Sequence, residues 1–279
     1  MTDTPTAASD TTGEAPAESS AGCATDPHDP HDHTGHDHPP TGADLVQGLV
    51  RALSVVALVI PALAVVMMLA VLPMAPSSPL VLLLGIGLGA AHLASLVLTS
   101  MFVSRTRRQL AVNPGLLAVR SAVEEVLRVA AVLLALLMWP LDARAELGVW
   151  IGAGTALVWM TLATAQTVAT RRRLARPSAW ATDTVATLLD QRVNPRSTAL
   201  MRVLDVIGTA AFQIGATVLV ILSPVLVIGT AVLSIGSGLS TLVLQRRELA
   251  ARTASPWAFV PLGVGLLTLA LAILGIASV

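Results

Sequence analysis

Residues 51–73 read RALSVVALVIPALAVVMMLAVLP, and from Ala52 onward this stretch carries no charged residue. The hydrocarbon core of a bilayer is about 30 Å thick, and a helix crosses it in roughly 20 apolar residues. The stretch therefore predicts a membrane-spanning helix. The whole chain shares its character, because 54% of the residues are hydrophobic, only 12% are charged and the mean hydropathy is +0.76. Soluble domains carry about 25% charged residues, so the bilayer is the expected solvent.

Six more stretches of similar length follow the first. We predict an all-α fold, a polytopic transmembrane helical bundle with seven spans. The predicted spans are residues 51–73, 79–104, 120–140, 147–170, 202–223, 225–245 and 257–277.

A weak internal repeat accompanies these spans. The first, third and fifth open with an apolar residue and Arg, and the second, fourth and sixth are followed by the pattern Arg-Arg-x-Leu-Ala. The pattern suggests three helical hairpins plus one helix. Arginines and prolines that flank helix ends in any membrane protein explain it equally well, so both interpretations stay open.

The first 44 residues differ in composition from the rest of the chain. They hold nine acidic residues and no arginine, and residues 2–40 contain no aromatic or large aliphatic side chain. Such a composition cannot bury enough apolar surface to offset the entropy of ordering. We predict a disordered tail at residues 1–44 and a transmembrane helical domain at residues 45–279.

Arginine clusters predict the orientation. They follow the second, fourth and sixth spans, at Arg105–Arg108, Arg171–Arg173 and Arg246–Arg247, and positively charged loops stay on the cytoplasmic side. The N-terminus is then cytoplasmic and the C-terminus extracytoplasmic. Because all 17 basic residues are Arg and Ala, Val and Leu dominate, the composition is typical of a GC-rich bacterium. We expect a location in the bacterial plasma membrane.

Several kinds of chemistry are disfavoured. The chain has no lysine for a Schiff base, one histidine outside the tail where a bis-histidine haem needs two, and no phosphate-binding loop. We expect the lipid bilayer, another membrane protein or a second copy of the chain as partners, and no nucleic acid.

The third predicted span carries the most informative charges. Its uninterrupted apolar run, residues 129–139, covers only about 16 Å, so Glu124, Glu125 and Arg128 are drawn into the membrane, where ionisable groups are costly and face the bundle interior. Arg120, Glu124 and Arg128 stand at i, i+4 and i+8, which predicts a ladder of opposite charges. Glu125 reaches Arg128 only at i+3 and is expected to be the less compensated acid. A structural role and a polar functional site are both open.

Three further residues are candidates for a polar intramembrane site. His92 lies near the middle of the second span and can pack, shuttle a proton or meet a carboxylate of the third span. Asp205, three residues after Arg202, is expected to form an interfacial pair. Gln213 lies deeper and can line a polar interior together with Thr209 and Thr217.

The string Glu124-Glu125-Val126-Leu127-Arg128 resembles the paired-glutamate motif of intramembrane metalloproteases of the CAAX-protease type. The resemblance covers five residues and implies a metal-dependent enzyme that acts within the membrane. Those enzymes also need histidines on later helices, and no histidine follows His92, which departs from the family pattern.

Five histidines alternate with aspartates in the tail, at His28, His31, His33, His36 and His38. Imidazole and carboxylate groups can collect Zn, Ni, Co or Cu ions. We consider a loosely bound divalent transition metal and a merely solubilising tail as alternatives.

The leading functional hypothesis is a small transporter or channel-like protein with a polar site at His92, Glu124, Glu125, Arg128, Asp205 and Gln213. The alternatives are a non-enzymatic accessory or scaffold subunit of a membrane complex and the metalloprotease-like enzyme. The residues favour a protein without enzymatic activity over an enzyme.

Overall fold

The computed structural model describes residues 42–76, 78–106, 114–176, 194–245 and 255–278, together with Asp183, Thr184, Ala186 and Thr187. This part of the chain contains no strand and forms seven α-helices of 18 residues or more. They are α1 (Gly42–Val71), α2 (Leu80–Thr106), α3 (Pro114–Met138), α4 (Arg144–Leu174), α6 (Pro195–Leu222), α7 (Val227–Gln245) and α9 (Val260–Ala277). Short 3-10 turns at η1 (Leu72–Met74), η3 (Leu141–Ala143), η4 (Pro224–Leu226) and η5 (Pro256–Phe259) adjoin helix ends.

Each predicted span corresponds to one of these helices. The first, third and fifth helices begin earlier than predicted, at Gly42, Pro114 and Pro195. The prediction counted only the apolar residues needed to cross a bilayer, and a helix can continue beyond them. Helix α1 thus starts inside the segment predicted to be a tail. The negative charge of Asp44, in the first turn of α1, interacts favourably with the positive N-terminal end of the helix dipole. Residues 1–41, with the predicted disorder, lie outside the described residues.

Six of the seven helices are long and apolar enough to cross a membrane, and α3 is the exception. Large hydrophobic side chains stand on the outside of the bundle, among them Leu58 on α1, Leu137 on α3 and Ile228 on α7. An exterior of this kind suits lipid rather than water. The six apolar helices are therefore compatible with a membrane protein.

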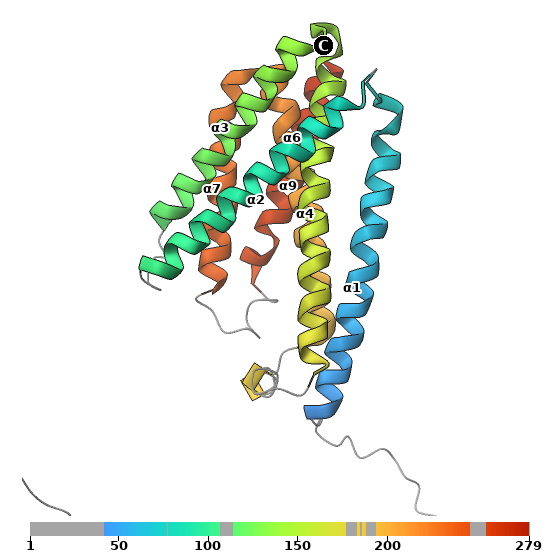
Figure 1. The fold of residues 1–279 in the computed structure, drawn as a ribbon, viewed down its shortest axis with the longest axis vertical. Coiled ribbons are helices and arrows are strands. Elements are labelled where there is room, and N and C mark those ends of the chain that lie inside the picture. The colour runs from blue at the N-terminus through green and yellow to red at the C-terminus, as the bar shows by residue number, and fades with distance from the viewer. Residues whose placement is uncertain are drawn as a thin grey trace, which may run out of the picture. The chain divides into compact units, whose positions relative to one another are not determined.

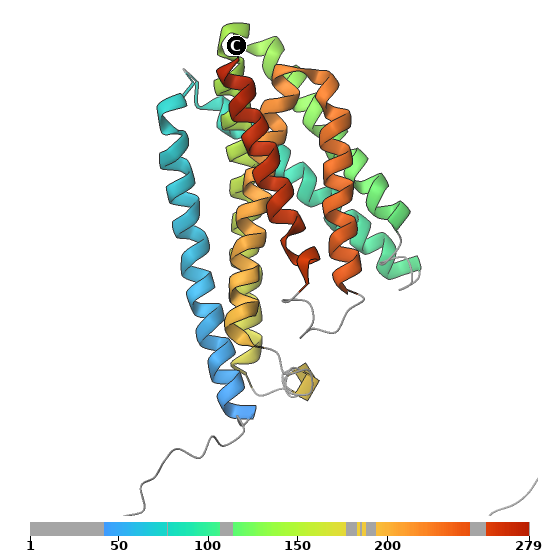
Figure 2. The ribbon, with the colours of Figure 1, turned by 180° about the vertical axis from the view of Figure 1, so that it is seen from behind.

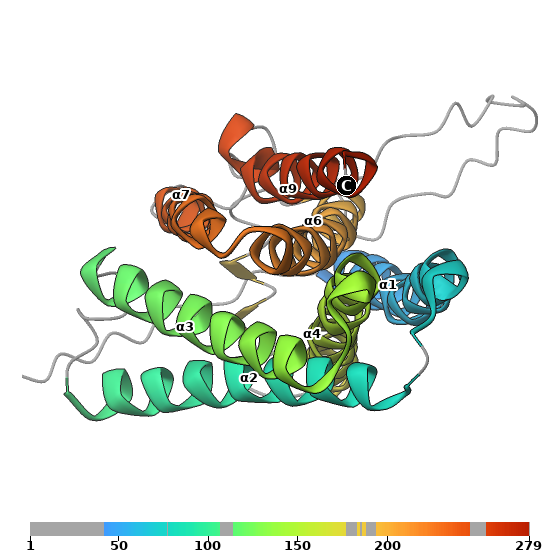
Figure 3. The ribbon, with the colours of Figure 1, turned by 90° about the horizontal axis from the view of Figure 1, so that it is seen from above.

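Helices α4 and α6 occupy the centre of the bundle, with the other five around them (Figure 3). Their glycines allow backbones to approach closely. A Cβ added at Gly152 of α4 would lie 2.6 Å from the Cα of Ile214 on α6, and one at Gly215 of α6 would lie 2.5 Å from the carbonyl carbon of Thr268 on α9. Small residues of this kind mark helix contacts in membranes.

Consecutive helices run in alternating directions (Figures 1 and 2) but are seldom each other's main neighbours. Helix α1 packs against α4 and α6, and α2 packs chiefly against α4. The predicted hairpins therefore do not form as separately packed pairs. The reason is that the closest glycine contacts join α4 and α6 to each other and to α2 and α9.

One end of the bundle is called the arginine end here, because α4 finishes there at Arg171, Arg172 and Arg173. Helices α3 and α6 begin at this end and α2 and α7 finish there (Figure 1). The other end holds the short turns η1, η3 and η4 and the end of α9.

Candidate functional site: a polar cavity and a buried ion pair

The charges of α3 form two separate ion pairs instead of one ladder. The Nε of Arg120 lies 2.7 Å from Oε1 of Glu124, and the Nε of Arg128 lies 3.2 Å from Oε2 of Glu125. The predicted i, i+4 contact between Glu124 and Arg128 is therefore replaced by an i, i+3 contact. The expectation that Glu125 is poorly compensated is wrong, because Arg128 turns towards it and away from Glu124.

Arg128 is buried, with 1% of its surface exposed, and helix α6 supplies most of its partners. Its Nη1 donates to Oγ1 of Thr217 at 2.8 Å and to the carbonyl of Gln213 at 3.4 Å, and its Nη2 donates to Oε1 of Gln213 at 3.0 Å. The guanidinium also lies 5.6 Å from the ring centre of Phe212, within cation–π range. Most of the five N–H groups of this side chain thus meet an acceptor.

The carboxylate of Glu125 extends this network to α7. Besides Arg128, it accepts a hydrogen bond of 2.8 Å from Oγ1 of Thr230, and it is 3% exposed. The buried pair thus joins α3 to α6 and α7. A charge pair that is hydrogen-bonded on both sides is stable where neither partner alone would be.

His92 of α2 is fully buried and contacts α3 through the backbone. Its Nε2 lies 3.0 Å from the carbonyl oxygen of Glu124. Because a carbonyl only accepts, Nε2 is the donor of this hydrogen bond. The Nδ1 atom has no partner among the described residues. The sequence allowed for a carboxylate partner, but the Glu124 carboxylate is engaged by Arg120.

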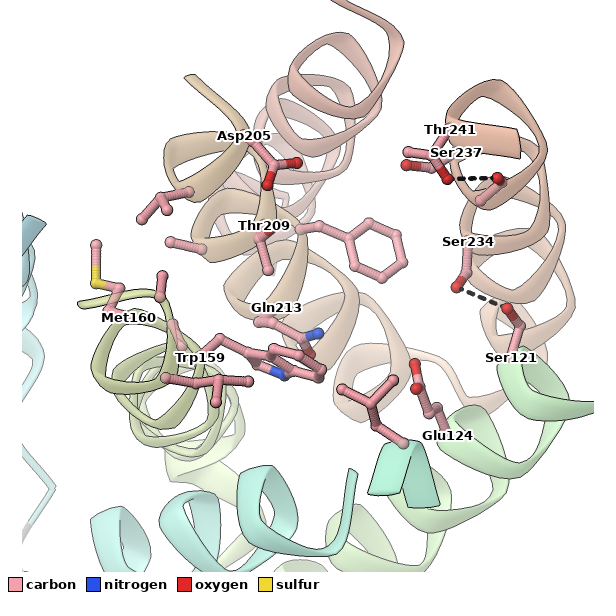
Figure 4. A pocket seen from close by; sticks show the side chains of 18 of the residues that line it. Ser121, Glu124, Trp159, Met160, Asp205, Thr209, Gln213, Ser234, Ser237 and Thr241 are labelled. Carbon is pink, nitrogen blue, oxygen red and sulfur yellow. Dashed lines mark hydrogen bonds between the residues drawn. The ribbon is translucent and has the colours of Figure 1, made fainter. Parts of the chain in front are cut away.

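A cavity of about 340 Å³ lies between α2, α3, α4, α6 and α7 (Figure 4). Its charged lining comes from two ion pairs, Arg120 with Glu124 on α3 and Arg202 with Asp205 on α6. Hydroxyl and amide groups supply the rest of its polar lining: Ser121, Gln166, Thr209, Gln213, Ser234, Ser237 and Thr241.

The α6 pair is looser and more exposed than the α3 pair. Nη1 of Arg202 and Oδ2 of Asp205 are 3.6 Å apart, and the side chains are 35% and 47% exposed. Arg202 is held from the other side by Oε1 of Gln166 at 2.7 Å. Asp205 was predicted to pair with Arg202, and the pair forms at the rim of this cavity.

Trp159 of α4 lines the cavity and carries a buried hydrogen-bond donor. Its Nε1 is buried and has no partner among the described residues. Gln213 lines the same cavity, and its Oε1 is occupied by Arg128. Gln213 therefore joins the cavity to the buried ion pair.

The predicted site residues thus fall into three groups. Glu124, Asp205 and Gln213 line the cavity. Glu125 and Arg128 form the buried ion pair and are not part of the lining. His92 contacts the backbone of α3 at Glu124. The five tail histidines lie outside the described residues. Where the chain is described, no three His, Cys, Asp or Glu side chains gather closely enough to hold a metal ion.

Sequence reasoning missed the contribution of α7. Its hydroxyl residues Thr230, Ser234, Ser237 and Thr241 recur at intervals of three or four, which places them on one helix face. Thr230 meets Glu125, and the Oγ of Ser234 lies 3.4 Å from that of Ser121 (Figure 4). This periodic stripe was visible in the sequence. The donor of Trp159 had no comparable signal.

Comparison of the chain with known protein families, with characterised proteins and with solved structures finds no match.

Proposed function

We propose that this chain is a seven-span membrane protein that binds a small polar solute in the cavity of Figure 4 and carries it across the bilayer, as a small transporter or channel-like protein does. The observation that carries the proposal is a polar, charge-bearing cavity inside a bundle whose exterior is apolar. Polar groups inside a membrane are costly and usually serve a pathway for solutes or ions.

The seventh span in this proposal is α3. Its 25 residues give a length of about 37 Å at 1.5 Å per residue, which exceeds the hydrocarbon thickness. Its buried charges, Glu125 and Arg128, face the interior, whereas Val126 and Leu137 are exposed on the outer face. Helix α3 can therefore carry these charges and still present an apolar face to lipid.

We place the arginine end in the cytoplasm of a bacterial cell, because Arg171, Arg172 and Arg173 lie there and basic loops stay inside. The N-terminus is then cytoplasmic and the C-terminus extracytoplasmic. Arg120 and Arg202, near the starts of α3 and α6, bring the cavity close to this end. Solute would therefore enter from the cytoplasmic side in the conformation described.

Thiol labelling tests the proposal directly, because the chain has a single cysteine, Cys23. In a Cys23→Ser background, Ser237→Cys places a thiol in the cavity, and Val232→Cys places one on the outer face of the same helix, where the native side chain is 63% exposed. A membrane-impermeant thiol reagent is applied to inside-out and right-side-out vesicles. We expect rapid labelling of Ser237→Cys from the cytoplasmic side, slower labelling from the outer side and none of Val232→Cys.

The outcomes separate the candidate functions. Labelling from both sides supports a transport pathway. If Ser237→Cys reacts from the cytoplasmic side alone, the cavity is a binding site without a pathway, and the transport proposal fails. If it reacts from neither side, the polar groups only hold the helices together, which is the expected result for an accessory or scaffold subunit.

A further inference from the structure

We infer that the solute of this cavity is a small aminocarboxylate zwitterion, with its ammonium group at Asp205 and its carboxylate at Trp159 and Gln213. The inference rests on the proposed function, because it names the class of solute that the same cavity binds. Its three grounds are the charge balance of the lining, the free acceptor capacity of Asp205 and the N–H donors of Gln213 and Trp159.

The charges of the lining balance. The cavity holds two guanidinium groups, of Arg120 and Arg202, and two carboxylates, of Glu124 and Asp205. A solute with a net charge would add an uncompensated charge to a site of low dielectric constant, which is unfavourable. A zwitterion adds equal and opposite charges, so the site stays neutral.

Asp205 provides the position for the ammonium group. Its carboxylate has one described partner, Arg202 at 3.6 Å, and is 47% exposed. Arg202 is itself held by Gln166 at 2.7 Å, so Asp205 can accept hydrogen bonds from a solute while Arg202 stays in place. The Glu124 carboxylate is less available, because Arg120 contacts it at 2.7 Å and it is only 13% exposed.

The carboxylate position is formed by two N–H donors. Oε1 of Gln213 accepts a hydrogen bond from Arg128, so the N–H groups of its Nε2 are left to donate into the cavity. The Nε1 of Trp159 is buried without a partner in the described part of the chain. Trp159 and Gln213 both line the cavity, and Figure 4 draws Asp205 at the opposite end of the view from them. A buried N–H group that lacks an acceptor, as that of Trp159 does, is costly, and a bound carboxylate would satisfy it together with the Gln213 amide.

The size of the cavity and the spacing of its groups suit a short solute. Asp205 and Gln213 are two helical turns apart, about 12 Å along α6. Both side chains and two hydrogen bonds take up much of that distance, so a solute with its charged groups a few bonds apart fits between them. The volume of about 340 Å³ is at the small end of the range for ligand pockets.

A matched series of probes tests the inference on the full chain. γ-Aminobutyrate carries both charges, butyrate carries only the carboxylate and butylamine only the ammonium group. We expect γ-aminobutyrate to raise the unfolding temperature of the purified protein and to slow the labelling of Ser237→Cys. Butyrate and butylamine should do neither. Glycine and 6-aminohexanoate, run in parallel, report the preferred spacing of the two charges.

Two variants locate the charged groups of the solute. Asp205→Asn removes the acceptor charge, and Trp159→Phe removes the N–H donor while an aromatic ring stays in the wall. Each should weaken γ-aminobutyrate binding about tenfold, the expected effect of losing a hydrogen bond to a charged group. Asp142→Asn in η3, at the other end of the bundle, is the control and should bind as the native chain does. If Asp205→Asn does not fold, Trp159→Phe alone decides.

The inference is overturned if butyrate or butylamine stabilises the protein as well as γ-aminobutyrate does, if no zwitterion in the series binds, or if Trp159→Phe binds normally. A failure of the proposed function would look different. Ser237→Cys would then resist labelling from both sides, or react from the cytoplasmic side alone, even when no solute is present.

Discussion

At the scale of single residues, Arg128 explains how α3 accommodates charges inside the bundle. Its guanidinium is shared among Glu125 of its own helix and Thr217 and Gln213 of α6. The same residue fixes which way the Gln213 amide points. A buried cation therefore both stabilises the bundle and orients one donor of the cavity wall.

We predict that Arg128→Met destabilises the protein by about 3–5 kcal/mol, because it leaves the Glu125 carboxylate buried without its cation. The double variant Glu125→Gln with Arg128→Met should recover much of this loss, since no unpaired charge remains. Reversible unfolding in detergent micelles measures both. Arg202→Met is the matched control, because Arg202 and Asp205 have the same i, i+3 spacing but are partly exposed, and the loss there should not exceed about 1 kcal/mol. Equal losses in the two single variants would contradict the argument.

At the scale of helices, polar faces line the cavity and glycine contacts set how closely the helices pack. Ser121 and Glu124 of α3, Thr209 and Gln213 of α6 and the hydroxyl stripe of α7 converge on one cavity. Glycine contacts instead draw α4, α6 and α9 together. The cavity wall formed by α4 and α6 thus rests on one of the close glycine contacts between helices.

We predict that Gly152→Ala lowers stability by about 1–3 kcal/mol, the usual cost of overpacking, because the added Cβ would lie 2.6 Å from the Cα of Ile214 and 2.9 Å from the Gln213 carbonyl. Gly87→Ala on α2 is the control, since nothing lies within 4 Å of its added Cβ. The control should be neutral or slightly stabilising. Unfolding temperatures in detergent measure both, and a neutral Gly152→Ala would mean that α4 and α6 are less tightly packed than described.

At the scale of the whole molecule, the tail and the bundle are predicted to act separately. The tail histidines His28, His31, His33, His36 and His38 remain predicted metal ligands, outside the described residues. In the bundle, His92 is bonded to a backbone carbonyl, and the nearby carboxylate of Glu124 is paired with Arg120. Metal binding and solute binding should therefore respond to different substitutions.

We predict that replacing the five tail histidines by alanine in the full chain abolishes Zn²⁺ and Ni²⁺ binding, measured by titration calorimetry. The unfolding temperature without metal and the response to γ-aminobutyrate should not change, because the altered residues precede α1. His92→Gln serves as the comparison and should leave metal binding intact. Persistent metal binding after loss of the tail histidines would assign the metal to the bundle and would contradict separate roles.

The local sequence determined the helices of this protein. Hydropathy and helix length are properties of neighbouring residues, so the number of long helices in the described part of the chain and the approximate residues of each were predictable. The burial of Glu125 and Arg128 inside the bundle was predictable too. Only the tertiary structure decided which charges pair across helices, that α4 and α6 form the centre and where the cavity lies. Arg128 meets Gln213 across 85 residues of chain, and a contact at that separation depends on how helices pack, which periodicity within one helix does not encode.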